Sequence, residues 1–185
     1  MKVLLGVSNH HFHLTEEDYK ILFGDTPIEI KKELVQKGQY ASNLTATIKT
    51  EKGSIEHVRL LTPLRKYTQV EISKTDAYRL GIDPPVRDSG DLRNAAMVEI
   101  VGTHGYIKKE CAILATRHIH MTEEDRKKLN LEGKTEVQVQ FDGEKGATLD
   151  HVQLKVDPSY TLELHLDTDD ANALLLKTGD SGTIK

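Results

Sequence analysis

The sequence predicts a mainly β protein with short helices, built as two homologous small β-barrel domains from an internal repeat. Three observations predict this fold class. A pair of histidines followed by Thr-Glu-Glu-Asp occurs twice, at residues 11–18 and 118–125. Segments that alternate polar and apolar residues follow each copy, separated by Lys-Gly, Asp-Gly and Asp-Pro turns. Each copy also leads into only one short helix, with Thr15 or Thr122 as its expected N-cap.

The repeat extends beyond the histidine pairs. Residues 51–53 match 144–146, 56–58 match 150–152, 76–77 match 170–171, and 88–90 match 180–182. The offset between the copies shortens along the chain, which we interpret as small deletions in the second copy. Two homologous halves explain this pattern most simply. We therefore expect a first domain over residues 1–95 and a second over residues 96–185, packed together.

In the first half, an apolar strand at residues 3–7 leads into His11 and His13. The three acidic residues after Thr15 suit the first turn of a helix, where they face the positive end of its dipole. Beyond this helix, residues 45–49 and 58–61 have the pattern of strands.

The second half repeats this order. Residues 112–115 form an apolar strand before His118 and His120, and residues 136–140 and 160–166 alternate with period two. Short strands with regular turns favour a small barrel in each half.

The spacing of each histidine pair puts both imidazoles on one face of a strand. Alignment of the halves pairs Glu71 with His165, each a polar residue between apolar neighbours. Three protein ligands with an open fourth position are typical of catalytic zinc. The two predicted ligand sets are His11, His13 and Glu71, and His118, His120 and His165. The competing interpretation is that some of these are hydrogen-bonded core or surface histidines.

Two further groups are candidates for ligand binding. Asn172 follows His165 closely enough to supply another oxygen or to touch a ligand. Arg65 and Lys66 lie just before Glu71, where a guanidinium could bind a phosphate through two parallel hydrogen bonds. An exposed basic turn is an equally good interpretation of this pair from composition alone.

Composition excludes several classes of protein. The net charge of −4, with no long basic block, argues against a broad nucleic-acid surface. No apolar run approaches the roughly 18 residues of a membrane helix. Cys111 is the single cysteine, which excludes an internal disulfide and a thiolate-rich zinc finger. We expect a cytoplasmic protein without nucleic-acid or membrane partners.

Three segments resemble the PduL-type phosphate propanoyltransferases, a phosphotransacylase family: residues 6–14, 62–73 and 117–121. The resemblance runs nearly end to end. It implies two β-barrel domains with two zinc ions at their junction. It also implies reversible transfer of a short acyl group, acetyl or propanoyl, between coenzyme A and inorganic phosphate. Histidine and carboxylate ligands also suit other divalent metals.

The resemblance also implies residue roles. The two ligand sets above would each hold one zinc, and Arg65 matches the family's phosphate-contacting arginine. The family's coenzyme A site matches Ser8, Lys32, Arg59, Leu61, His165 and Asn172. The family tends to dimerise, so a homodimer is one expectation. Members in bacterial microcompartments carry an N-terminal shell-targeting peptide, whereas this sequence begins directly on the first strand, and we expect it to be free in the cytosol.

Two other functions fit the histidine pairs. A dinuclear metallohydrolase would use a bridging hydroxide to attack an ester or phosphoester, without coenzyme A. A non-enzymatic module would use closed metal sites only to clamp the two halves together.

Overall fold

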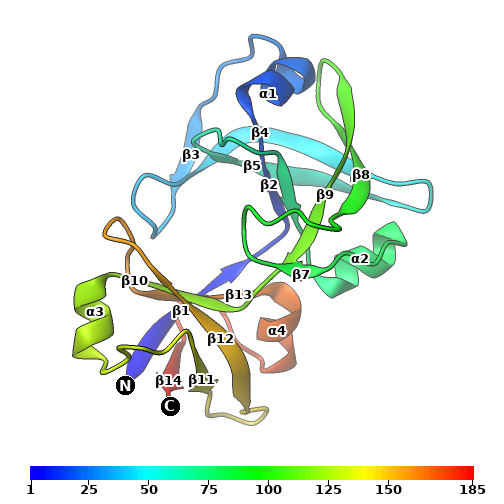
Figure 1. The fold of residues 1–185 in the computed structure, drawn as a ribbon. Helices are drawn as coiled ribbons and strands as arrows, with labels where there is room; N and C mark the ends of the chain where they lie inside the picture. The colour runs from blue at the N-terminus through cyan, green and yellow to red at the C-terminus, as the bar shows by residue number, and fades with distance from the viewer. The chain divides into compact units, whose positions relative to one another are not determined.

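The computed structural model describes all residues 1–185, which form fourteen strands and four short helices (Figure 1). The helices are α1 (Glu16–Phe23), α2 (Lys74–Leu80), α3 (Glu123–Lys128) and α4 (Thr168–Ala173). The strands are β1 (Lys2–Ser8), β2 (His11–His13), β3 (Ile30–Glu33), β4 (Tyr40–Lys49), β5 (Ser54–Thr62), β6 (Gln69–Glu71), β7 (Val86–Arg87), β8 (Ala96–Val101), β9 (Tyr106–Ala115), β10 (His118–Met121), β11 (Glu136–Gln140), β12 (Thr148–Val156), β13 (Glu163–Asp167) and β14 (Ser181–Ile184). None of the helices has the length and hydrophobicity that a membrane crossing requires.

The chain divides into two compact units. Unit 1 consists of residues 1–8, 35–37 and 116–185, and unit 2 consists of residues 9–34 and 38–115. Each unit contains a closed barrel of six strands, so the predicted fold class is confirmed.

The barrel of unit 1 has the strand order β1-β13-β10-β12-β11-β14, with β14 pairing back onto β1. Its core contains Ile119 of β10, Val152 of β12 and Leu164 of β13, all fully buried. These are the inward positions of strands whose alternate residues face away from the core, as the period-two pattern predicts.

The barrel of unit 2 closes in the order β9-β6-β2-β5-β4-β8, and β8 pairs with both β4 and β9. Strand β3 extends the sheet beyond β4, and β7 pairs with β9. Phe12, Leu60 and Val70 are fully buried in its core. Each of the six pairings that close this barrel has the same parallel or antiparallel sense as its counterpart in unit 1.

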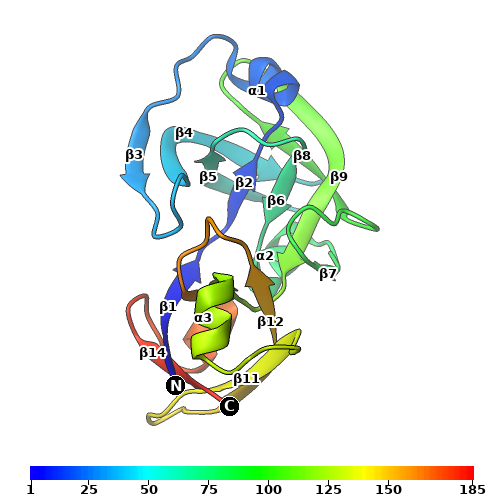
Figure 2. The same cartoon turned by 60° about the vertical axis from the view of Figure 1, so that its left-hand side comes forward.

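The two halves of the sequence exchange their first strands. Strand β1 comes from the first half but pairs with β13 and β14 of the second half. Strand β9 comes from the second half but pairs with β6 of the first half. Figure 2 shows β1, in dark blue, beside the red β14. The compact units therefore differ from the expected division at residue 95, because residues 1–8 and 96–115 each lie with the other half's remaining strands.

Both predicted N-caps form. The Thr15 and Thr122 hydroxyls accept hydrogen bonds from the backbone N–H groups of Asp18 and Asp125, respectively. Both cap residues have extended backbone angles, and the helix begins at the next residue. Each cap thus fixes where the helix after the histidine strand begins.

The matched histidines His57 and His151 have the same backbone role. Both have a positive φ, of 58° and 56°. Each lies where a β-bulge adds one residue to its strand, opposite Ala46–Ile48 in unit 2 and Val137–Val139 in unit 1. The match between Ser89 and Ser181 has no such counterpart, because Ser89 lies in the loop after β7 and Ser181 begins β14.

Candidate metal centres and an arginine beside one of them

The first candidate centre lies in unit 2, where β2 pairs with β6. The register places His11 opposite Glu71 and His13 opposite Gln69. Glu71 Oε2 lies 3.5 Å from His11 Nε2, and Glu71 Oε1 lies 3.8 Å from His13 Nε2. One ligand atom from each of the three residues lies within 4.8 Å of the others, which suits a single metal ion.

The second centre lies in unit 1, where β10 pairs with β13. The register places His118 opposite His165 and His120 opposite Glu163. The three imidazole rings have centroid separations of 4.6, 4.9 and 4.7 Å. Their ligand atoms also lie within 4.8 Å of one another. Each predicted ligand set is therefore brought together within one unit.

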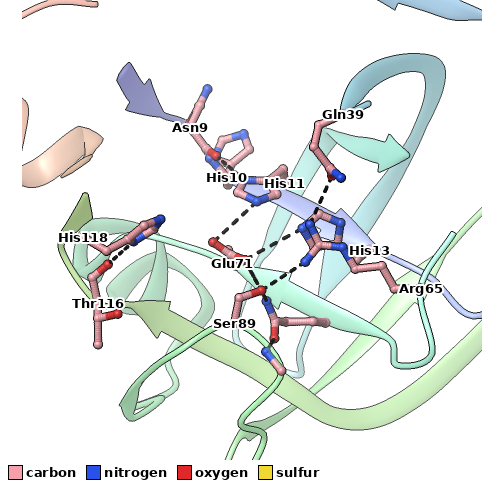
Figure 3. Close-up of polar contacts among 12 residues, drawn as sticks. Asn9, His10, His11, His13, Gln39, Arg65, Glu71, Ser89, Thr116 and His118 are labelled. Atoms are coloured by element: carbon pink, nitrogen blue, oxygen red, sulfur yellow. Dashed lines mark hydrogen bonds and ion pairs between the residues drawn. The ribbon is translucent and has the colours of Figure 1, made fainter. Parts of the chain in front are cut away.

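The first histidine of each pair is held in the same way. The Nδ1 atom of His11 lies 2.8 Å from the carbonyl oxygen of Asn9, and that of His118 lies 2.8 Å from the carbonyl oxygen of Thr116 (Figure 3). A carbonyl accepts from Nδ1–H only, so the lone pair of the ring remains on Nε2. This orientation of a metal-binding histidine by a backbone carbonyl is common in metalloproteins.

Electrostatics favour neutral imidazoles at two of these positions. Burial, followed by the positive charges of His11 and Arg65, lowers the pKa of His13 well below its usual value. Burial, with Lys155 and the neighbouring histidines, does the same to the pKa of His118. A neutral imidazole is the form that binds metal.

His11 behaves differently from the other two. Burial lowers the pKa of His11, but the charge and hydrogen bond of Glu71 outweigh burial, so its pKa is raised overall. A cation between these two side chains would satisfy the Glu71 carboxylate in place of the proton on His11. The donor set of two imidazoles and one carboxylate fits a divalent metal such as zinc.

Arg65 extends toward the first centre from the loop after β5 (Figure 3). Its backbone N–H donates to the Leu14 carbonyl at 2.7 Å, which ties this loop to the end of β2. Its Nη1 donates to Tyr67 Oη at 2.8 Å and to Ser89 Oγ at 3.1 Å, and its Nη2 donates to Gln39 Oε1 at 3.3 Å. All three partners are neutral, so the guanidinium makes no direct hydrogen bond to a carboxylate.

The remaining candidate residues divide between the units. Ser8 ends β1 in unit 1, where it pairs with Asp167, and Asn172 is exposed on α4 of the same unit. In unit 2, Lys32 is exposed on β3, and Arg59 and Leu61 are half-buried on β5.

The structure adds two contacts of Arg65 that the sequence did not assign. Gln39 and Ser89 lie 26 and 24 positions from Arg65, yet both hydrogen-bond its guanidinium. Ser89 Oγ also lies 3.3 Å from Glu71 Oε1, so it connects Arg65 to a metal ligand. For Ser89 the only sequence signal was the Asp-Ser-Gly match, which pointed to the repeat and not to the site. Gln39 lies in residues 38–42, which the sequence leaves open as an ordinary loop or part of a ligand wall.

A family model described as phosphate propanoyltransferase matches residues 4–177 of this chain. A phosphate propanoyltransferase of Thermotoga maritima is 48% identical over 184 residues, which cover 96% of this chain and 86% of that protein. A phosphate propanoyltransferase of Priestia megaterium is 46% identical over 184 residues, covering 98% and 85% of the two chains. A third, from Limosilactobacillus reuteri, is 41% identical over 181 residues, covering 97% and 85%.

Proposed function

Because this chain belongs to the phosphate propanoyltransferase family, and is an acyltransferase of that kind, we propose how its residues perform the transfer. The proposed reaction is the reversible exchange of a short acyl group, acetyl or propanoyl, between coenzyme A and inorganic phosphate. The proposal uses two divalent metal ions, most simply zinc, one held in each unit, and Arg65 as the phosphate-binding residue. We place this activity in the cytoplasm, which suits a single buried thiol.

The observation that carries this proposal is the set of unused donors on Arg65. A guanidinium has five N–H donors. Three are directed to Tyr67, Ser89 and Gln39, which leaves Nε–H and one N–H of Nη2 without a protein acceptor. A planar guanidinium can bind two oxygens of one phosphate through a pair of neighbouring N–H donors. The three neutral partners hold the guanidinium in place without forming an ion pair with it.

The two ligand sets described above would hold the metals: His11, His13 and Glu71 in unit 2, and His118, His120 and His165 in unit 1. Bound zinc would supply Lewis acidity at the thioester carbonyl and would favour the thiolate form of coenzyme A.

The protein's own groups then do the following. Arg65 binds phosphate and directs one phosphate oxygen toward the acyl carbon, so that orientation replaces a random encounter. The phosphate oxygen forms the new bond to the acyl carbon as the carbon–sulfur bond breaks. The guanidinium balances negative charge on the phosphate throughout. No covalent acyl-enzyme is needed.

Coenzyme A would be bound by the side chains that match the family's site. We propose Ser8, Lys32, Arg59, Leu61, His165 and Asn172 for this role. The Arg59 guanidinium donates to the Ser42 carbonyl at 2.7 Å, which fixes one end of that side chain and supports a positioned cation for an anionic ligand.

The test is to mix acetyl phosphate or propanoyl phosphate with coenzyme A, to follow thioester formation, and to repeat the assay after chelation. We expect thioester formation that chelation abolishes and zinc restores. No thioester in the metal-loaded protein would refute the transferase, and unchanged activity after chelation would refute the role of metal. Hydrolysis of the acyl phosphate at the same rate without coenzyme A would instead indicate a metallohydrolase.

A further inference from the structure

In each unit, a buried polar residue lies two positions before the third metal ligand. In unit 2 this residue is Gln69, before Glu71, and in unit 1 it is Glu163, before His165. Gln69 is fully buried and Glu163 is 6% exposed. The registers match as well, because Gln69 lies opposite His13 and Glu163 lies opposite His120. The two positions are thus equivalent in the two barrels, although their residue types differ.

Both side chains contact the ligand that follows them. Gln69 Nε2 donates to Glu71 Oε1 at 2.7 Å. Glu163 Oε2 lies 3.0 Å from His165 Nε2, close enough for an ion pair, although the ring N–H is not aligned for a hydrogen bond. A carboxylate ligand can only accept a hydrogen bond, and it faces an amide donor. An imidazole ligand can donate from the ring nitrogen that does not bind metal, and it faces a carboxylate acceptor. The residue before the ligand therefore differs between the two units in the same way as the ligand does: an amide donor accompanies the carboxylate, and a carboxylate acceptor accompanies the imidazole.

Each of these residues is itself held by further contacts. Gln69 Oε1 accepts from the backbone N–H of Gly90 at 2.7 Å, which fixes the amide so that Nε2 points to Glu71. Glu163 accepts from Gln36 Nε2 at 3.2 Å. Gln36 in turn exchanges two hydrogen bonds with the backbone of Thr161, at 2.9 and 3.0 Å. Neither contact is a chance approach of a mobile surface side chain.

The backbone of unit 1 also leaves room for the Glu163 carboxylate. A Cβ atom at Gly6 would lie 2.7 Å from Glu163 Oε1, closer than non-bonded atoms approach. Gly6 is the residue of β1 that pairs with His165. A larger side chain at this position would therefore force the Glu163 carboxylate to move.

On the basis of the metal binding proposed above, we propose that Gln69 and Glu163 are positioning residues, each matched to the chemistry of its own third ligand. Glu163 accepts the proton of one ring nitrogen of His165, which leaves the other nitrogen for the metal. Gln69 fixes the orientation of the Glu71 carboxylate. Such partners typically contribute 10- to 100-fold to metal affinity.

The first experiment isolates the unit 1 centre. In the full chain with His11→Ala and His13→Ala, which removes the unit 2 centre, zinc and cobalt(II) affinities are measured by competition with a chromophoric chelator. Glu163→Gln is expected to weaken binding about 10- to 100-fold and to shift the visible cobalt(II) spectrum, while far-UV circular dichroism stays unchanged. Glu136→Gln is the matched control, because Glu136 lies 3.1 Å from the surface histidine His151, outside both centres. Unchanged affinity in Glu163→Gln would overturn the proposal.

The second experiment tests the matching itself. His165→Glu alone places two carboxylates together and is expected to lose most metal affinity. Adding Glu163→Gln to it recreates the Gln-x-Glu arrangement of unit 2 and is expected to restore affinity at least tenfold. A double variant that binds no better than His165→Glu would overturn the matching. Loss of metal in Glu163→Gln as complete as in His165→Ala would make Glu163 a ligand and would also overturn it.

These outcomes are separate from failure of the proposed function. If the unsubstituted chain binds no metal under the same conditions, the metal part of the proposed function is refuted before any variant is compared. If it binds metal and the variants behave alike, only the positioning roles are refuted.

Discussion

Replacement of Arg65 by lysine tests the phosphate site most directly. Lysine keeps the positive charge but replaces a planar fork with a single ammonium. In the structure, two N–H donors of Arg65 have no protein acceptor, and the contacts to Tyr67, Ser89 and Gln39 hold the guanidinium in one orientation. Lysine can offer one of the two donors to a phosphate oxygen, so the variant loses at least one charged hydrogen bond.

The size of the effect follows from that single bond. A hydrogen bond to a charged group contributes about 1.5–3 kcal/mol. Since about 1.4 kcal/mol corresponds to a factor of ten, Arg65→Lys should lower kcat/KM for phosphate about 10- to 150-fold. The KM for acyl-coenzyme A should change by less than about twofold, because the lost bond serves the phosphate alone.

The assay is the formation of acyl phosphate from acyl-coenzyme A, with phosphate varied at saturating acyl-coenzyme A and then the reverse. Arg79→Lys is the control, because Arg79 is exposed on α2 and outside both centres. A kcat/KM for phosphate within threefold of the unsubstituted enzyme would refute the proposal that two donors of Arg65 bind phosphate. An equal loss for both substrates would refute its assignment to phosphate.

Three further predictions follow from other contacts. Tyr67→Phe removes one neutral bond to Arg65 and should raise the KM for phosphate about two- to tenfold, measured in the same assay; an unchanged KM would mean that Tyr67 does not hold the guanidinium. Lys109→Met leaves the buried Asp18 carboxylate without its 2.6 Å cation. Because Lys109 is itself about half exposed, we expect a loss of about 2 kcal/mol in urea unfolding, and Asp18→Asn in the same background should recover part of it. Burial raises the pKa of the Cys111 thiol to about 12. Only the unfolded chain then releases this proton near pH 9, so the free energy of unfolding should fall relative to Cys111→Ala between pH 9 and 12; a constant difference from pH 7 to 10 would contradict this.

Local patterns predicted the parts of the site that lie on single strands. Two histidines one residue apart share a strand face wherever that strand is placed. The pairing of Glu71 with His165 came from the repeat, and the structure brings each beside its own histidine pair. The caps at Thr15 and Thr122 were equally local, because a threonine hydroxyl can accept a hydrogen bond from the free backbone N–H three residues later without help from distant residues.

Other parts of the site depend on contacts between distant segments. Gln39 and Ser89 lie in loops, and no periodicity connects a loop residue to an arginine more than 20 positions away. The exchange of β1 and β9 was also hidden, because apolar residues in a strand do not show which barrel that strand joins. Sequence similarity between halves shows what repeats, but it does not show which copy completes which barrel.

The exchanged first strand has a consequence for the order in which the protein matures during synthesis. All strands of unit 2 have been made once residue 115 has been added. Strand β1 is synthesised first, yet its partners β13 and β14 are synthesised last. Val3 and Leu5, which the finished barrel buries, therefore stay without their partners for most of translation. An unpaired apolar strand readily joins other chains. Strand β1 is therefore the strand that waits longest for its partners in the nascent chain.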